Sequence, residues 1–248
     1  KRTQMKLSWW NVALLIVVLV GIGLRTFKVH EIPPGLYRDE AYTGMDSQET
    51  LDGDIRMYYD SSFGREPLFT WLVALSISIW GSSPFATRFP SLIIGVLTLF
   101  TLYGRTRELH GKRTALLATA VLAITLWHVH FSRVSFRAVM IPLFASLSVW
   151  QVAQGIRTQR KLHWIIGGTA AGVLLYTYIS ARLAPLPVFL FLVYMLTIKK
   201  MHIDRRILQS GILFLFVAAV VMAPLVTSTL LHWDEVFLRV QNVESIFN

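Results

Sequence analysis

Cysteine is absent from this 248-residue chain, and charged residues make up only 15% of it. The missing cysteines exclude a disulfide framework, a thiolate metal site and a cysteine nucleophile. Soluble domains contain about 25% charged residues, so the low charge argues against a water-soluble globule, as do the 54% hydrophobic residues and the mean hydropathy of +0.53. The sequence also lacks a phosphate-binding glycine loop, a dinucleotide fingerprint and a Ser-His-Asp arrangement, which disfavours a nucleotide ligand.

Long apolar runs dominate the chain instead. A transmembrane helix needs about 17 to 25 mostly apolar residues. Seven stretches of the chain meet this requirement. An eighth, 67–80, has only 14 residues and is typical of an interfacial or buried helix. We therefore predict an all-α fold, a polytopic transmembrane helix bundle of about seven spans. The predicted spans are 9–27, 88–104, 114–131, 139–156, 164–180, 183–198 and 207–231.

The charge imbalance, 24 Lys and Arg against 14 Asp and Glu, sets the expected orientation. With the N-terminus in the cytoplasm and 67–80 outside the spans, the cytoplasmic segments hold 14 of the 24 basic residues, and the outer side holds 12 of the 14 acidic ones. If 67–80 crossed the membrane, three basic loops would face outward, against the positive-inside rule. The net charge of +10 therefore reflects orientation, and nucleic acid is not an expected partner. The cytoplasmic segments are 1–8, 105–113, 157–163 and 199–206.

The first outer loop, 28–87, is the most polar part of the chain and holds nine acidic residues. Two surface helices are expected in it, one near 40–52 and one over 67–80, which Pro67 would open. Asp39 is expected to be the N-cap of the first helix. That helix would be amphipathic, as interfacial helices are. Its apolar face is expected to carry Ala41, Met45 and Leu51, and its opposite face Asp46 and Glu49.

The acidic pair Asp39-Glu40 stands at the start of this first surface helix. The dipole at a helix N-terminus favours a negative charge, so this placement suits a general base or a metal ligand near the membrane surface. A plain structural cap is the alternative, because Asp is a common N-cap. Both interpretations stay open at this point.

Arg133 and Arg137 lie at the predicted outer boundary, against the positive-inside trend. They are four residues apart and would share one face of a helix. They could clamp a phosphate, or act as interfacial anchors and partners of loop acids. Arg182 is a third phosphate candidate, whereas Arg88 is expected to pair with carboxylates of the outer loop.

The order of these features resembles a known family. An apolar anchor is followed by an Asp-Glu helix and a proline-opened helix, and then by several characteristic segments. This order and spacing resemble the N-terminal half of the GT-C membrane glycosyltransferases, in the group of the protein O-mannosyltransferases and the lipid A aminoarabinose transferases. The resemblance covers about residues 8–200. The segments that carry it are 64–69 (GREPLF), 88–91 (RFPS), 103–111 and the Ser-Arg pair at 132–133.

The resemblance implies an activity and a set of site residues. Such enzymes move a sugar from a polyprenyl-phosphate carrier to a protein or glycolipid acceptor on the extracytoplasmic side. Asp39 would be the general base on the acceptor hydroxyl, and Glu40 would support it or position the acceptor. The residues expected to bind the substrate or the lipid phosphate are Arg65, Glu66, Arg133, Arg137 and Arg182.

Two departures from the family pattern bear on this expectation. Glu66 stands where relatives often carry His or Lys, and the basic residue, Arg65, is one position earlier. Relatives also commonly carry an Asp shortly after the residue that matches Arg133, but 134–138 contains no carboxylate. We therefore expect no metal site and no required cofactor, although a divalent cation is left open.

The sequence leaves one alternative function and disfavours another. The missing acid and a length about half that of the relatives leave a catalytically inactive GT-C-like subunit of a larger membrane complex as the alternative. A transporter is disfavoured, because the predicted spans hold no carboxylate for an ion relay. We treat 1–248 as one transmembrane domain with an outer tail at 232–248, and we expect its C-terminus to be incomplete. The protein is expected to contact the lipids of a bacterial inner membrane.

Overall fold

The computed structural model describes residues 9–61, 65–183 and 204–232. Within these ranges the chain is helical, apart from connecting loops and one isolated bridge between Tyr59 and Arg65, so the all-α prediction is confirmed. The longer helices are α1 Trp9–Thr26, α2 Arg38–Leu51, α3 Pro67–Trp80, α4 Pro84–His110, α5 Lys112–Ile124, α6 Leu126–Arg133, α7 Met140–Thr158, α8 Lys161–Val173 and α10 Arg205–Leu231. The short 3-10 helices are η2 Arg137–Val139, η3 Leu174–Tyr176 and η4 Ile179–Leu183.

Four of the described helical segments are long and apolar enough to cross a membrane: α1, α4, η2 with α7, and α10. The predicted span 114–131 is not straight, because α5 and α6 meet at an angle of 58° around Thr125, whose backbone is extended. The glycine-rich prediction 164–180 forms α8 only as far as Val173 and then continues as 3-10 turns. Nearly all of the predicted span 183–198 and of the tail 232–248 lies outside the described residues, so the count of seven spans stays a prediction.

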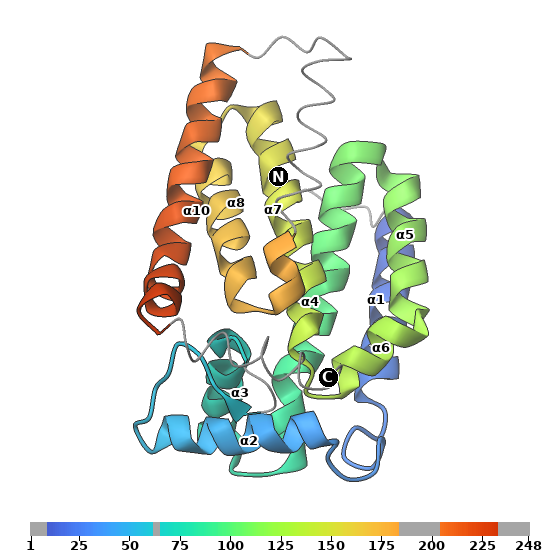
Figure 1. Cartoon of the computed structure of the whole chain (residues 1–248). Helices are drawn as coiled ribbons and strands as arrows, with labels where there is room; N and C mark the ends of the chain where they lie inside the picture. The colour runs from blue at the N-terminus through green and yellow to red at the C-terminus, as the bar shows by residue number, and fades with distance from the viewer. Residues whose placement is uncertain (1–8, 62–64, 184–203, 233–248) are drawn as a thin grey trace, which may run out of the picture.

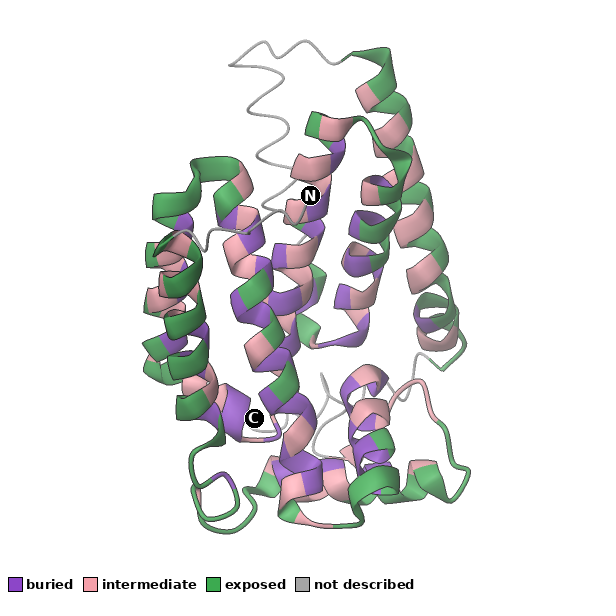
Figure 2. Cartoon of the chain, turned by 180° about the vertical axis from the view of Figure 1, so that it is seen from behind, coloured by how far each residue is buried: buried purple, intermediate pink, exposed green. Residues whose placement is uncertain are grey.

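Helix α4 is the centre of the bundle. It packs against α1, α3, α5, α6 and α7, while α8 joins α7 to α10 (Figure 1). Buried residues gather on the inner helices, and the outer faces of α1 and α10 are exposed (Figure 2). Because these outer faces carry Leu and Ile side chains, they suit contact with lipid. A hydrophobic core joins α3, α4, η2 and α7. It is formed by Phe69, Val73, Ile77, Ala86, Ile94, Val139, Met140 and Leu143.

Helices α2 and α3 lie together at one end of the bundle, with α2 running across it (Figure 1). The surface helices predicted near 40–52 and 67–80 are thus present as helices, and Pro67 opens α3 as expected. The N-cap of α2 is Tyr37 and not Asp39, which stands one residue inside the helix. Its first turn is closed by Glu40, whose Oε2 accepts the Tyr37 N–H at 2.9 Å.

The side of α2 that packs against the rest of the protein is polar, and its interfacial location stays a prediction. Its buried side is polar, comprising Glu40, Thr43, Asp46 and Ser47, whereas Met45 is 61% exposed. The polar side chains can be buried because groups on neighbouring elements form hydrogen bonds with them. Ser47 Oγ, for example, donates to the Thr70 carbonyl of α3 at 3.0 Å. An amphipathic pattern read from the sequence cannot include such partners.

Candidate active site

Asp39 and Arg65 lie side by side at the end of the bundle where α2 and α3 are (Figure 1). Arg65 Nη2 is 3.4 Å from Asp39 Oδ1, and Arg65 Nη1 donates to the Asp39 carbonyl at 3.0 Å and to Thr43 Oγ1. The Arg65 side chain is 1% exposed, but the Asp39 side chain is 33% exposed. Burial, and then the nearby charge of Arg137, lower the pKa of Arg65. The pair therefore combines a buried cation with a carboxylate that a substrate can reach.

A short backbone bridge places Arg65 beside α2. The Tyr59 N–H donates to the Arg65 carbonyl at 3.0 Å, and the Arg65 N–H donates to the Tyr59 carbonyl at 2.6 Å. Tyr59 is itself fully buried, and its hydroxyl lies 2.6 Å from Thr50 Oγ1 of α2. The chain between α2 and α3 is thus fastened at the residue that contacts Asp39.

Glu66 brings two further arginines to the same place. Its carboxylate is 1% exposed and lies 3.5 Å from Arg137 Nε and 3.5 Å from Arg182 Nη2. These arginines come from η2 and η4, and the Arg137 guanidinium also stacks 5.0 Å from the centre of the Tyr178 ring. Glu66 therefore draws together three segments that are far apart in the sequence.

Some buried polar atoms in this region have no hydrogen-bond partner among the described residues. We call Asp39, Arg65, Glu66, Arg137 and Arg182 the arginine cluster; its three cations exceed its two carboxylates by one charge. Arg65 Nε and Glu66 Oε2 are buried and have no hydrogen-bond partner among the described residues. Buried polar atoms are nearly always bonded in native proteins, so the unpartnered Arg65 Nε–H donor suits an anionic ligand, whereas Glu66 Oε2 needs a hydrogen-bond donor.

Glu40 lies in a different environment. Its Oε1 accepts from Arg88 Nε at 2.8 Å and from the Ser135 N–H at 2.8 Å. Its Oε2 accepts from the Tyr37 N–H at 2.9 Å and from Arg88 Nη2 at 3.1 Å. Both side chains of this Glu40 network are at most 2% exposed, and the expected pairing of Arg88 with a loop carboxylate is confirmed. Because both oxygens are occupied twice, Glu40 is a positioning residue that joins α2, α4 and the chain after α6.

Arg133 does not join Arg137. Helix α6 ends at Arg133, and the backbone is extended at Val134 and Phe136, so the two arginines do not share a helical face. Arg133 instead donates to the Leu24 carbonyl at 2.8 Å and to the Ile32 carbonyl at 2.9 Å, at the end of α1 and in the loop after it. Arg133 and Arg137 therefore do not form the pair predicted from their spacing, and Arg137 meets Arg182 at Glu66 instead.

Arg25 has a structural role that its position at the end of the first apolar segment does not indicate. This side chain is fully buried at the break between α5 and α6. It satisfies carbonyls that the break leaves without helical partners, and it thereby holds α6 in place. Its partners are the carbonyls of Gly21, Leu122 and Ala123, the Ser132 hydroxyl and His128 Nδ1.

No group of three His, Asp or Glu residues within 9–61, 65–183 and 204–232 lies close enough together to hold a metal ion. The possible divalent cation therefore gains no ligand set from the described residues.

Comparisons with known proteins agree on the fold. The profile of the family described as dolichyl-phosphate-mannose-protein mannosyltransferase matches residues 64–233. The crystal structure of ArnT from Cupriavidus metallidurans in the apo state superimposes with a TM-score of 0.70 at 17% sequence identity. The match covers 92% of this chain but only 43% of that one. No curated protein matches the sequence.

A fold shared with ArnT and a family match over most of the chain lead to one conclusion. The protein is a multi-pass membrane protein of the GT-C superfamily and belongs to the dolichyl-phosphate-mannose-protein mannosyltransferase family.

Proposed function

We propose that the chain forms the donor-binding and acceptor-activating part of a membrane glycosyltransferase. The donor is a polyprenyl-phosphate-linked sugar, and the acceptor is a hydroxyl of a protein or glycolipid on the extracytoplasmic side. The observation that carries this proposal is the arginine cluster, where the accessible Asp39 carboxylate contacts Arg65 and the adjacent Glu66 contacts Arg137 and Arg182. The proposed location of the cluster outside the cytoplasm rests on the predicted orientation, with the N-terminus in the cytoplasm and the chain in a bacterial inner membrane.

Asp39 is the proposed general base. As the acceptor oxygen attacks the anomeric carbon, its proton passes to the Asp39 carboxylate, and the bond from that carbon to the phosphate oxygen breaks. Asp39 suits this role because a third of its side chain is exposed and Arg65 orients it. Glu40, with both oxygens occupied, supports α2 and does not accept the proton.

The phosphate is the leaving group, and its negative charge grows as the bond to the sugar breaks. Arg65, Arg137 and Arg182 provide cations at the place where this charge develops. Glu66 keeps Arg137 and Arg182 together through contacts of 3.5 Å, which are loose enough to leave donors for the phosphate.

An apolar cavity of about 340 Å³ lies between α3, the end of α8 and α10. One of its walls includes Leu68, two residues after Glu66, so an isoprenoid chain in this cavity would hold its phosphate near the arginines. Its lining residues are Met57, Leu68, Trp71, Val173, Tyr176, Val221 and Pro224.

The test is sugar transfer by the full-length protein carrying Asp39→Asn. Loss of a general base typically lowers the rate by about 10²- to 10⁴-fold. Carrier binding should be retained, and the loss of thermal stability should be small, because Arg65 keeps its hydrogen bonds to the Asp39 carbonyl and to Thr43 Oγ1. Asp52→Asn, at the exposed far end of α2, is the matched control and should retain full activity. Unchanged transfer by Asp39→Asn would remove Asp39 as the base. Carrier binding without any transfer by the unaltered protein, together with a stoichiometric partner, would favour the inactive-subunit alternative.

A further inference from the structure

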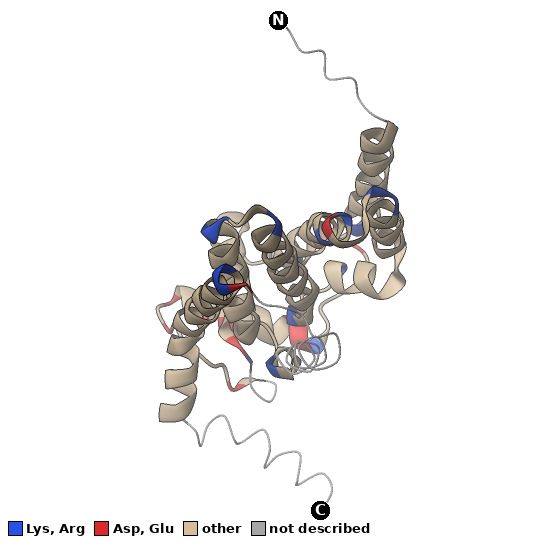
Figure 3. Cartoon of the chain, turned by 90° about the horizontal axis from the view of Figure 1, so that it is seen from above, with Lys and Arg blue, Asp and Glu red and all other residues tan. Residues whose placement is uncertain are grey.

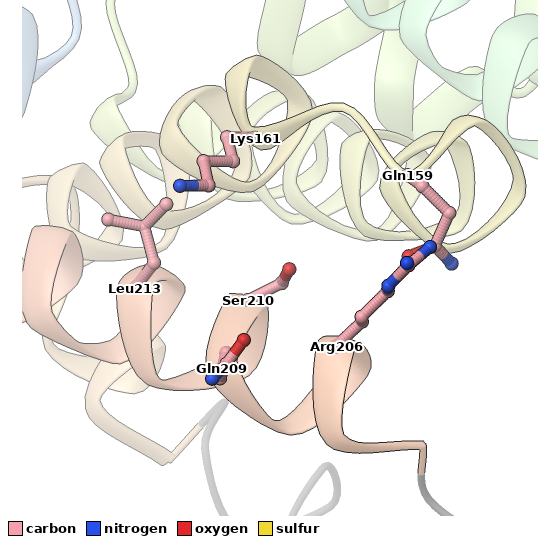
Figure 4. A pocket seen from close by; sticks show the side chains of 6 residues that line it. All are labelled: Gln159, Lys161, Arg206, Gln209, Ser210 and Leu213. Atoms are coloured by element: carbon pink, nitrogen blue, oxygen red, sulfur yellow. The ribbon is translucent and has the colours of Figure 1, made fainter.

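A polar cavity lies at the opposite end of the bundle from the arginine cluster. It is located between the turn that joins α7 to α8 and the first turns of α10, and its volume is about 640 Å³. Figure 4 shows Arg206 extending toward Gln159, with Lys161 above the side of α10 that carries Leu213. Its lining residues are Gln159, Lys161, Arg206, Gln209, Ser210 and Leu213.

The lining carries two cations, Lys161 and Arg206, and no carboxylate. Neither cation forms an ion pair with any residue in the part of the chain that the structure describes. Glu108 at this end is already engaged, by Arg157 Nε at 2.5 Å and by Gln154 Nε2 at 2.9 Å. Lys and Arg residues mark the helix ends on this side (Figure 3). The cavity therefore has a positive charge that no described residue neutralises.

Apolar surface continues from this cavity along both neighbouring helices. On α8, Leu162, Ile165 and Ile166 are exposed, and on α10 Ile212 and Leu215 are exposed. A ligand that fits both surfaces has an anionic polar head and apolar chains. Basic pockets of this kind between transmembrane helices bind the head groups of anionic lipids.

We propose that this cavity binds an anionic phospholipid of the phosphatidylglycerol class. Its phosphodiester lies between Lys161 and Arg206, its glycerol hydroxyls bond to Gln209 and Ser210, and its acyl chains follow α8 and α10. A phosphatidylcholine head group fits less well, because its quaternary ammonium group would meet the two cations and has no hydrogen-bond donor for the amide and hydroxyl groups. This site is independent of sugar transfer.

Native mass spectrometry of the full-length protein in detergent, titrated with phosphatidylglycerol or with phosphatidylcholine, tests the proposal. Phosphatidylglycerol should bind at least about tenfold more tightly, and K161Q/R206Q should weaken it by about 30-fold, since each basic residue near a membrane surface contributes about a factor of five. The control R160Q/R205Q removes the same charge from the same turns outside the cavity and should change binding less than threefold. If K161Q/R206Q does not fold, K161R/R206K should fold and retain the preference.

Equal weakening by the two double variants would overturn the proposal in favour of diffuse attraction. Equal binding of the two lipids would also overturn it. If inorganic phosphate or soluble glycerol phosphate displaces the lipid at similar concentrations, the cavity is a site for a free anion and the lipid assignment fails.

Discussion

Two carboxylates at the α2–α3 end of the bundle, Glu40 and Glu66, are buried to the same extent and both contact arginine, but their surroundings differ. Glu40 accepts four hydrogen bonds, two of them from Arg88. Glu66 contacts Arg137 and Arg182 only at 3.5 Å. A buried charge is stable only when its hydrogen bonds are satisfied. The pair of Glu40 and Arg88 meets this condition within the fold, whereas Glu66 and its two arginines have room for further hydrogen bonds.

Glu40 and Glu66 thus have different surroundings within the same acidic loop. The Glu40 network joins α2, α4 and the chain after α6, and so decides where Arg137 begins η2. The arginine cluster then uses that placement. The number and geometry of the hydrogen bonds therefore distinguish a buried ion pair that supports the fold from one that can also bind a ligand.

The largest expected effect is on stability, from Glu40→Gln. Removing one partner of a buried ion pair leaves Arg88 uncompensated and costs about 3–5 kcal/mol. Glu66→Gln should cost less, because its two contacts at 3.5 Å are weaker than the four hydrogen bonds of Glu40. Thermal unfolding in detergent measures both, and Glu40→Gln combined with Arg88→Met should recover part of the loss. Equal destabilisation by the two glutamate variants would erase the distinction.

Next comes carrier binding, for which Arg137→Gln and Arg182→Gln are the informative variants. A hydrogen bond to a charged group contributes about 1.5–3 kcal/mol, so each change should weaken binding of a polyprenyl phosphate by about 10- to 100-fold with little loss of stability. Arg38→Gln, an exposed arginine at the start of α2 outside the cluster, serves as the control. A similar loss with all three variants would show that general charge attraction, and not the cluster, holds the phosphate.

Gly95→Ala tests the comparison without changing a charge. A Cβ at this position of α4 would come within 2.6 Å of Ser132 Cβ in α6, and so α6 must move. Overpacking of this kind costs about 1–3 kcal/mol. Carrier binding should also fall several-fold, because Arg137 follows α6. Gly23→Ala, where a Cβ meets nothing within 4 Å, should leave both measurements unchanged. Unaltered carrier binding in a destabilised Gly95→Ala protein would separate α6 from the site.

The smallest effect concerns Asp46, whose pKa is raised by burial although the Ser61 hydroxyl opposes the shift. A raised pKa means that the folded protein holds this proton more tightly than the unfolded chain. Folding stability from this group is therefore greatest below the ordinary Asp pKa and falls as the pH rises through the folded-state value. Relative to Asp46→Asn, the unaltered protein should lose thermal stability as the pH increases from about 4 to 7. A constant difference over that range would contradict the prediction.

Much of the fold was predictable, because apolar runs and basic loops are local signals. They indicated α1, α4, α7 and α10 as spans and set α3 apart as a short outer helix. The bend between α5 and α6 was not predictable. It depends on Arg25, which reaches across from another helix to the freed carbonyls.

The candidate site was predictable as a list of residues and not as an arrangement. The sequence by itself determined the apolar segments, the acidic outer loop and the presence of Asp39 beside Glu40, since these follow from composition and spacing. Only the tertiary structure decided that Asp39 meets Arg65, that Glu40 is enclosed by Arg88, and that Arg137 and Arg182 meet at Glu66 while Arg133 does not. The physical reason is that a side chain's role depends on which donors reach it across long sequence separations, and the packing of α2, α4, η2 and η4 sets those distances.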